Sequence, residues 1–212
     1  MNHQNLTAVD KYPYLGIEIQ SDLNWHNHIN KICNKGNKTL GLLKRNINSC
    51  PVDTKRLAYL SLVRPCVEYA SSVWDPFLVK HITEIEKLQR RSARFIVSNY
   101  NRCSSVSAML HKLNLPTLES RRSVSRLVIL FKAIHGHIAI PTNHLKHSAR
   151  TTRLSSGPGL TFTHVSSRCD THKYSYFPRT IREWNKLDNI TRTQTAIEVF
   201  KTEAEKSALV YY

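Results

Sequence analysis

Apolar side chains recur with helical periodicity along much of this 212-residue chain. In residues 26–48 the apolar positions fall on one stripe when successive residues are placed about 100° apart around a helix axis. The stripe consists of Ile29, Ile32, Cys33, Gly36, Leu40, Leu43 and Ile47. A single apolar stripe is typical of a helix that packs one face against a core, so the pattern predicts an amphipathic helix here.

Similar patterns predict further helices. One opens at Pro51 and Asp53 and is ended or kinked by Pro65, because proline has no backbone N–H and its ring crowds the preceding turn. Another is expected at residues 79–98, where Ile82, Ile85, Leu88, Phe95 and Ile96 share a face. Shorter helices are expected at residues 104–113, 117–135, 178–187 and 195–207.

Two kinds of segment depart from this periodicity. Residues 14–19 predict a short strand, and residues 160–163 a second, shorter one. Residues 144–159 are rich in Ser, Thr, Gly and basic side chains, which indicates a mobile linker. The chain is therefore expected to fold as a mainly α protein.

The charge balance favours a polyanionic partner, since 31 Lys and Arg outnumber 15 Asp and Glu and give a formal net charge of +16. Residues 120–169 contain no acidic residue at all. No run of about 18 apolar residues predicts a transmembrane helix. Residues 1–10 lack the apolar core of a secretory signal, so an intracellular protein, in the nucleus or cytoplasm, is expected.

Positive side chains lie opposite the apolar stripes of several helices. We predict that nine of them contact nucleic acid: Lys31, Lys35, Lys38, Arg45, Lys87, Arg91, Arg94, Arg121 and Arg122. A solvated surface explains the charges of any one helix equally well. Their repetition on several helices favours binding to a sugar-phosphate backbone.

Four blocks carry a resemblance to a known family. They read YLGIEIQSDLNWHNHI (residues 14–29), LVRPCVEYASSVWDP (62–76), LQRRSARF (88–95) and YFPRTIREWNKL (176–187). In this order they resemble the region that follows the palm in reverse transcriptases of jockey-like, LINE-type non-LTR retrotransposons. Asp188 departs from the pattern, because the family usually has proline there. The likeness extends over about residues 14–200.

The resemblance implies a division of the chain. Residues 1–25 would be the end of the palm, 26–136 a helical thumb-like domain, 137–173 a basic flexible linker and 174–212 a C-terminal helical tail. The chain would begin after the catalytic centre. Its partners would be the template-primer duplex of RNA and DNA and the missing palm domain, with no membrane involved. Its role would be to clamp the duplex during target-primed reverse transcription.

Polymerase chemistry is not expected from this chain by itself. Such enzymes hold two divalent metals with clustered aspartates, and in the family two of these aspartates are adjacent. The aspartates of this chain are Asp10, Asp22, Asp53, Asp75, Asp170 and Asp188, of which no two are adjacent. We therefore expect no enzymatic activity and no cofactor for this chain, although the parent polymerase would use Mg²⁺.

Other interpretations remain open. Asp53 and Lys55, with Asp22 upstream, are the best grouping for a nuclease, although Asp53 also suits a helix cap. The nearest approach to a zinc site is His164, Cys169 and His172, with Cys103 far away in sequence. Trp25, Trp74 and Trp184 are better explained as core residues than as platforms for bases. An alternative function is a free-standing interaction module that docks its N-terminal strand on a partner.

Overall fold

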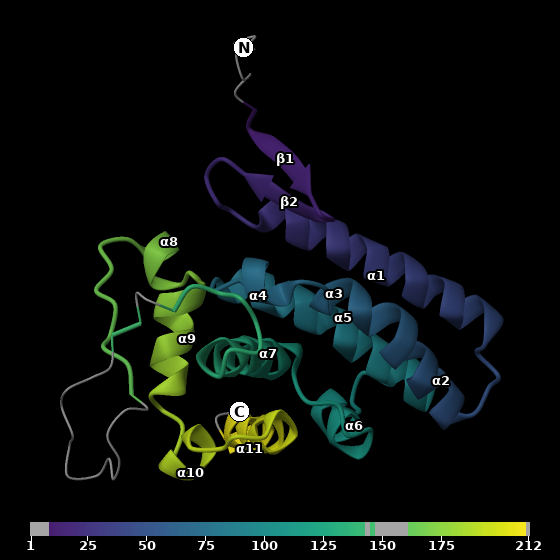
Figure 1. The fold of residues 1–212 in the computed structure, drawn as a ribbon. Helices are drawn as coiled ribbons and strands as arrows, with labels where there is room; N and C mark the ends of the chain where they lie inside the picture. Colours follow the sequence, from purple (N-terminus) through teal and green to yellow (C-terminus); the bar gives the residue numbers. More distant parts are fainter. Residues whose placement is uncertain (1–8, 143–144, 147–160, 211–212) are drawn as a thin grey trace. The chain divides into compact units, whose positions relative to one another are not determined.

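The structure, a computed structural model, describes residues 9–142, 145–146 and 161–210, with only the backbone of residues 209 and 210. It is mainly helical with a two-stranded antiparallel sheet near the N-terminus, which confirms the predicted fold class. The chain divides into two compact units, whose helices and strands are labelled in Figure 1. Unit 1 comprises residues 1–70 and 76–115, and unit 2 comprises residues 71–75 and 116–212.

A β-hairpin opens unit 1. Strands β1 (Lys11–Tyr14) and β2 (Ile17–Gln20) are antiparallel, with Tyr14 opposite Ile17. Leu15 and Gly16 between them have φ of 47° and 84°, as a two-residue hairpin turn with two positive φ angles requires. The predicted single strand over residues 14–19 is therefore wrong, because the chain reverses in its middle.

The helices of unit 1 are α1 (His26–Asn46), α2 (Val52–Ala58), a π-helical turn η1 (Tyr59–Val63), α3 (Arg64–Glu68), α5 (Val79–Val97) and α6 (Val106–Lys112). Helix α1 packs against α5 and α3. The predicted apolar stripes face this packing, with Ile29 and Leu40 of α1 and Ile85 and Phe95 of α5 buried. The expected helices at residues 26–48 and 79–98 are confirmed.

Pro65 does not end the helical run, which continues through α3 to Glu68, but the hydrogen-bond pattern changes just before it. Proline cannot donate a backbone hydrogen bond, and the helix is interrupted by the π turn just before it. The N–H of Arg64 donates to the carbonyl of Tyr59, five residues back. Helix α3 then starts at Arg64, so that Pro65 lies in a first turn, where no internal donor is required.

Gly36 permits the close contact between α1 and α5. A Cβ atom at this position would lie only 2.5 Å from Cδ2 of Leu88, a side chain that is 1% exposed. Because Leu88 is enclosed by the core, it cannot easily move away. The two helices therefore approach at a distance that any larger residue than glycine would disturb.

Unit 2 contains α4 (Ser71–Trp74), α7 (Leu118–Ile134), α8 (Asp170–Lys173), α9 (Tyr176–Trp184), α10 (Asn189–Arg192) and α11 (Ile197–Val210). Its core is centred on Phe131, Trp184 and Phe200. The ring of Phe200 stacks on Phe131 at 4.4 Å and on Trp184 at 5.5 Å between centroids. Helix α7 packs against both α11 and α9.

Phe162 takes part in the core of unit 2 without forming the expected strand. Its backbone N–H donates to Oδ1 of Asn185 at 3.1 Å, and Nδ2 of Asn185 donates to its carbonyl at 2.7 Å. The amide side chain of Asn185 thus satisfies both backbone hydrogen-bonding groups of Phe162. The described part of residues 160–163 shows an isolated bridge at Phe162 where a strand was predicted.

The compact units group the elements differently from the four predicted segments. Helix α7, expected in the thumb-like domain, packs with the C-terminal helices, and so does the short segment 71–75. Most of the predicted linker at residues 144–159 lies outside the described residues. Among the helices of the described residues, none has the length and apolar character needed to cross a membrane.

Replacing the two glycines of α1 tests the packing at Gly36. Gly36→Ala should lower the free energy of unfolding by about 1 kcal/mol, because overpacking outweighs the gain in helix propensity. Gly41→Ala should raise it by about 0.5 to 1 kcal/mol, because its Cβ would meet its nearest neighbour, Nη1 of Arg45, at an ordinary 3.8 Å. Urea denaturation followed by circular dichroism measures both, and equal effects would contradict the close contact.

Candidate nucleic-acid interface

Helix α1 carries a stripe of positive charge on its exposed side. Lys31, Lys35, Lys38 and Arg45 are all exposed, and their spacing of three, four or seven residues places them along one face. Only Lys31 of these four forms an ion pair among the described residues, with Glu18 at 3.9 Å. No described carboxylate compensates the charge of the remaining three side chains of the stripe.

Helix α5 carries a second stripe, and one hydrogen bond connects it to α1. Lys87 and Arg91 are exposed and Arg94 is half-buried on one face of α5. Nη1 of Arg91 donates to Oδ1 of Asn37, the neighbour of Lys38, at 3.0 Å. Arg91 of the second stripe is thus attached to α1 beside Lys38.

Lys44 lies at the same junction. Partial burial lowers the pKa of Lys44, and the nearby guanidinium of Arg91 lowers it further. Lys44 occupies the helical face of Asn37, seven residues away, so it follows the line along which the helices meet. A pKa lowered by another cation is the sign of like charges held close to each other.

We call this surface the basic seam and define it by six residues: Lys38, Lys44, Arg45, Lys87, Arg91 and Arg94. Within the described part of the chain, none of the six forms an ion pair with a carboxylate. A surface depression beside it is lined by Asn34, Asn37, Lys38, Gly41 and Arg45. Side chains of this kind contact phosphate oxygens without reading base sequence.

The predicted contacts on α7 are placed differently. Arg121 is half-buried, and Arg122 is only 1% exposed. Nε of Arg122 donates to Oδ1 of Asp75 at 2.6 Å. The prediction that Arg122 contacts nucleic acid is therefore wrong, because its guanidinium is buried against a carboxylate.

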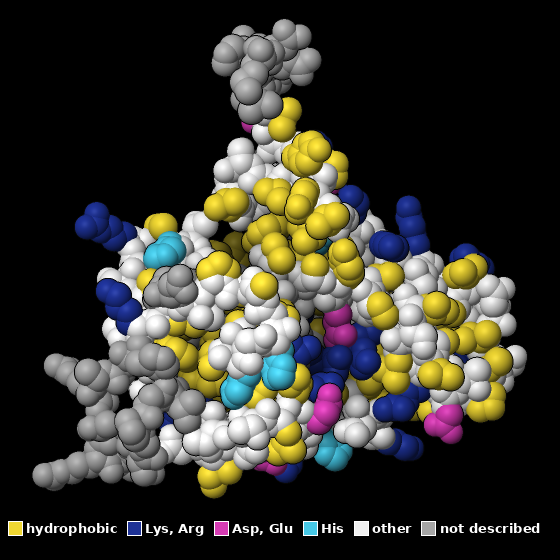
Figure 2. Space-filling view, in the orientation of Figure 1, with side chains coloured by type: hydrophobic (Ala, Val, Ile, Leu, Met, Phe, Trp, Pro, Cys, Tyr) yellow, Lys and Arg dark blue, Asp and Glu magenta, His cyan; other side chains and the backbone are white. Residues whose placement is uncertain are grey.

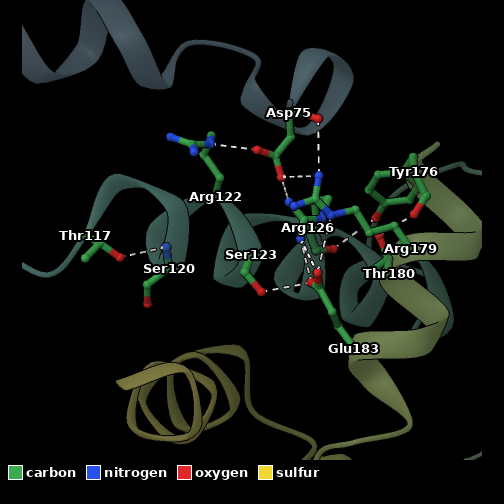
Figure 3. A network of polar contacts seen from close by, with 10 residues as sticks. All are labelled: Asp75, Thr117, Ser120, Arg122, Ser123, Arg126, Tyr176, Arg179, Thr180 and Glu183. Atoms are coloured by element: carbon green, nitrogen blue, oxygen red, sulfur yellow. Dashed lines mark hydrogen bonds and ion pairs between the residues drawn. The ribbon is translucent and has the colours of Figure 1, made fainter. Parts of the chain in front are cut away.

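Arg122 belongs to a buried ionic network in unit 2 (Figure 3). Asp75, with a side chain that is 4% exposed, forms ion pairs with Arg122, Arg126 and Arg179. Nη1 of Arg179 also donates to the backbone carbonyl of Asp75 at 3.3 Å. The segment before α5 is thereby connected to α7 and α9.

Glu183 forms the other half of the network. Its carboxylate accepts from Nη2 of Arg126 at 2.6 Å and from Oγ of Ser123 at 2.8 Å, and Nε of Arg179 lies 3.5 Å away. Burial raises the pKa of Glu183, but Arg126 and Arg179 lower it more, so the net shift is downward. Burial also lowers the pKa of Arg126, against the effect of Glu183, although arginine remains protonated in proteins.

A cavity of about 260 Å³ borders this network in unit 2. Arg126, Arg179 and Lys186 line it together with Glu119 and Glu183. The two carboxylates offset most of the positive charge there. The network therefore suits internal cohesion of unit 2 better than the capture of a polyanion.

The other candidate groupings are dispersed or buried. Lys55, which a nuclease would need to expose, is 3% exposed and donates to Oγ of Ser98 at 2.7 Å. His164, Cys169 and His172 are exposed, and among the described residues no three His, Cys, Asp or Glu side chains gather as a metal site. Trp74 and Trp184 are fully buried, which confirms their expected place in the core.

The sequence pattern did not indicate two parts of these sites. Lys44 was missed because it lies beside the apolar stripe of α1 and not opposite to it. The network of Asp75 was missed because its members lie on three separate segments. The block containing Trp74-Asp75-Pro76 and the block containing Arg179 and Glu183 meet through side-chain contacts that no spacing in the sequence predicts.

Comparisons with models of known families, with curated proteins and with solved structures found no match for this chain. The basic seam and the buried network are therefore interpreted from their own chemistry.

Replacing Asp75 tests the network. Asp75→Asn should lower the free energy of unfolding of unit 2 by about 3 to 5 kcal/mol, because it leaves buried guanidinium groups without their shared counter-charge. Asp170→Asn is the control, since the Asp170 side chain is 70% exposed and pairs with Lys173 at 3.8 Å. That change should cost less than about 1 kcal/mol. Urea denaturation followed by tryptophan fluorescence reports on unit 2 through Trp74 and Trp184, and similar losses in both variants would contradict the assignment.

The lowered pKa of Glu183 predicts that the stability of the protein falls at acidic pH. Because the folded pKa lies below the ordinary value of 4.5, the contribution of this carboxylate is fully present above pH 4.5 and is lost as pH falls through the folded pKa. Denaturation midpoints measured from pH 7 down to pH 3 should fall less steeply for Glu183→Gln than for the unchanged protein. Parallel curves would show that Glu183 titrates as an ordinary surface group.

Proposed function

We propose that this chain binds the sugar-phosphate backbone of a nucleic-acid duplex through the basic seam. The observation that carries the proposal is that Arg91 of α5 lies beside Asn37 and Lys44 of α1, while the other four cations of the basic seam lie on the same two helices without a paired carboxylate among the described residues. Such an arrangement repels itself unless an anion covers it. A duplex offers regularly spaced phosphates to several of these side chains at once.

The four sequence blocks support a more specific role. We propose that the chain corresponds to the thumb and following tail of a non-LTR retrotransposon reverse transcriptase, and that it clamps the template-primer duplex of RNA and DNA. In that role it has no catalytic activity of its own, because it lacks adjacent aspartates, and Mg²⁺ belongs to the palm of the parent polymerase. The expected compartment is the nucleus or the cytoplasm.

Counterion release sets the expected strength of this interaction. Each phosphate neutralised on a duplex contributes about 0.9 to the slope of log K against log salt concentration. If all six side chains of the basic seam engage, the slope is about −5, and affinity falls roughly a thousandfold between 50 and 200 mM salt. Because these contacts are to phosphates, affinity should depend little on base sequence.

A second candidate function is docking of a protein partner on the hairpin. Tyr12, Tyr14 and Leu15 are 61%, 57% and 71% exposed. Figure 2 shows hydrophobic side chains gathered over the hairpin, at the top of the view. The palm domain of the parent polymerase in the first proposal would be such a partner. Association through this surface would be insensitive to salt, in contrast to binding through the basic seam.

The paired change Lys38→Gln and Arg91→Gln tests the proposal. It should reduce the salt slope for an RNA–DNA duplex by about 2 and weaken binding about tenfold or more at 100 mM salt. The control is Lys112→Gln with Lys11→Gln, which removes the same charge from two exposed lysines that lie on α6 and β1, outside the basic seam. Fluorescence anisotropy titrations at several salt concentrations measure both quantities.

Two results would contradict the proposal. One is an equal loss of affinity in the two double variants, which would indicate attraction by net charge alone. The other is primer extension by the purified chain with Mg²⁺, which would show that the chain is itself catalytic.

A further inference from the structure

Tyr100 presents an exposed aromatic ring at the end of α5. The helix ends at Val97, and Ser98 follows in the left-handed conformation with φ of 56°, which turns the chain away from the helix axis. The side chain of Tyr100 is 53% exposed two residues later. This ring packs in no core of the described structure.

The loop that carries Tyr100 is held by hydrogen bonds of the residues that precede and follow it in the sequence. The side chain of Asn99 accepts from the backbone N–H of Asn101 at 3.0 Å and donates to Oγ of Ser104 at 3.1 Å. Nη1 of Arg94 donates to the carbonyl of Asn101 at 2.7 Å. The ring is thus presented by a preorganised loop, which reduces the ordering cost of binding.

Tyr100 adjoins the basic seam through two of its members. Nζ of Lys44 lies 5.5 Å from the centroid of the Tyr100 ring, in a cation–π contact. Arg94 donates to the backbone carbonyl of Asn101, the residue directly after Tyr100. Lys44, a cation suited to phosphate, therefore lies over one face of an exposed aromatic ring.

This combination is the one that proteins use for unpaired nucleotides. Positive side chains follow the backbone, and an aromatic ring stacks on a base whatever its identity, because every base has a π face. Bases inside a duplex are already stacked on each other, so a surface ring gains nothing from them. A base just beyond the end of the duplex has a free face.

We propose that Tyr100 is a stacking platform for the first unpaired base adjoining a duplex on the basic seam. The inference rests on the proposed function and specifies its ligand: a duplex with a single-stranded extension. The phosphates of the duplex contact the basic seam, Lys44 lies between these phosphates and one face of the ring, and the unpaired base stacks on the opposite face. Binding should then be about five- to tenfold tighter for the extended duplex than for the blunt one.

The test measures the Kd of the full chain for a blunt RNA–DNA duplex and for the same duplex with a short extension on the 5′ or the 3′ side. The first unpaired base is 2-aminopurine, whose fluorescence reports stacking. The unchanged protein should prefer one extended duplex and alter its fluorescence. Tyr100→Phe should retain both effects. Tyr100→Leu should lose both and bind the blunt duplex as before, and Tyr12→Leu, at an equally exposed tyrosine of the hairpin, should behave as the unchanged protein.

The possible failures are distinguishable. Equal affinity of the unchanged protein for blunt and extended duplexes, or a preference that survives Tyr100→Leu, would overturn the role of Tyr100 and leave the proposed function standing. A Tyr100→Leu variant that loses blunt-duplex binding to the same extent would also overturn it. Absence of salt-dependent binding to any duplex would overturn both proposals.

Discussion

The close packing of α1 against α5 at Gly36 determines where the positive charges of unit 1 lie. A helix that is apolar on one side and basic on the other has, by itself, an ordinary solvated surface. When two such helices approach as closely as Gly36 and Leu88 allow, the margins of their basic faces meet. Arg91 then reaches Asn37 across the junction, and its charge is felt at Lys44. The apolar contacts beneath these cations offset the free-energy cost of their mutual repulsion. A bound polyanion would reduce that repulsion.

In unit 2, by contrast, several positive charges are buried and paired with carboxylates. Arg122, Arg126 and Arg179 are withdrawn from solvent and share two carboxylates, so their role is cohesion of segments that are distant in sequence. Ion pairs of this kind are sensitive to the loss of one member, because the remaining charge stays buried. A count of basic residues cannot separate the two uses of arginine. The two uses differ in burial and in the presence of partner carboxylates. By these criteria the cationic surface belongs to unit 1 and the ionic core to unit 2.

The helices were largely predictable from the sequence because each stripe is a local property. Residues 26–48 and 79–98 each contain enough apolar positions to define one face without knowledge of the rest of the chain. The hairpin was not predicted, because Leu15 is an unusual residue for a position with positive φ and gave no turn signal. For the candidate site, the stripes of α1 and α5 could be derived, but their junction could not. Lys44 and Tyr100 depend on which helices are neighbours, and Asp75 depends on which buried arginines surround it.

The most direct measurement is lysine footprinting of the full chain with and without an RNA–DNA duplex. An amine-reactive reagent and mass spectrometry would compare Lys38, Lys44 and Lys87 with Lys11 and Lys112, all in unit 1. Contact between the basic seam and the duplex predicts protection of the first three and unchanged modification of the last two. Uniform protection of all five, or protection of none, would contradict the claim that the junction of α1 and α5 is the surface that holds nucleic acid.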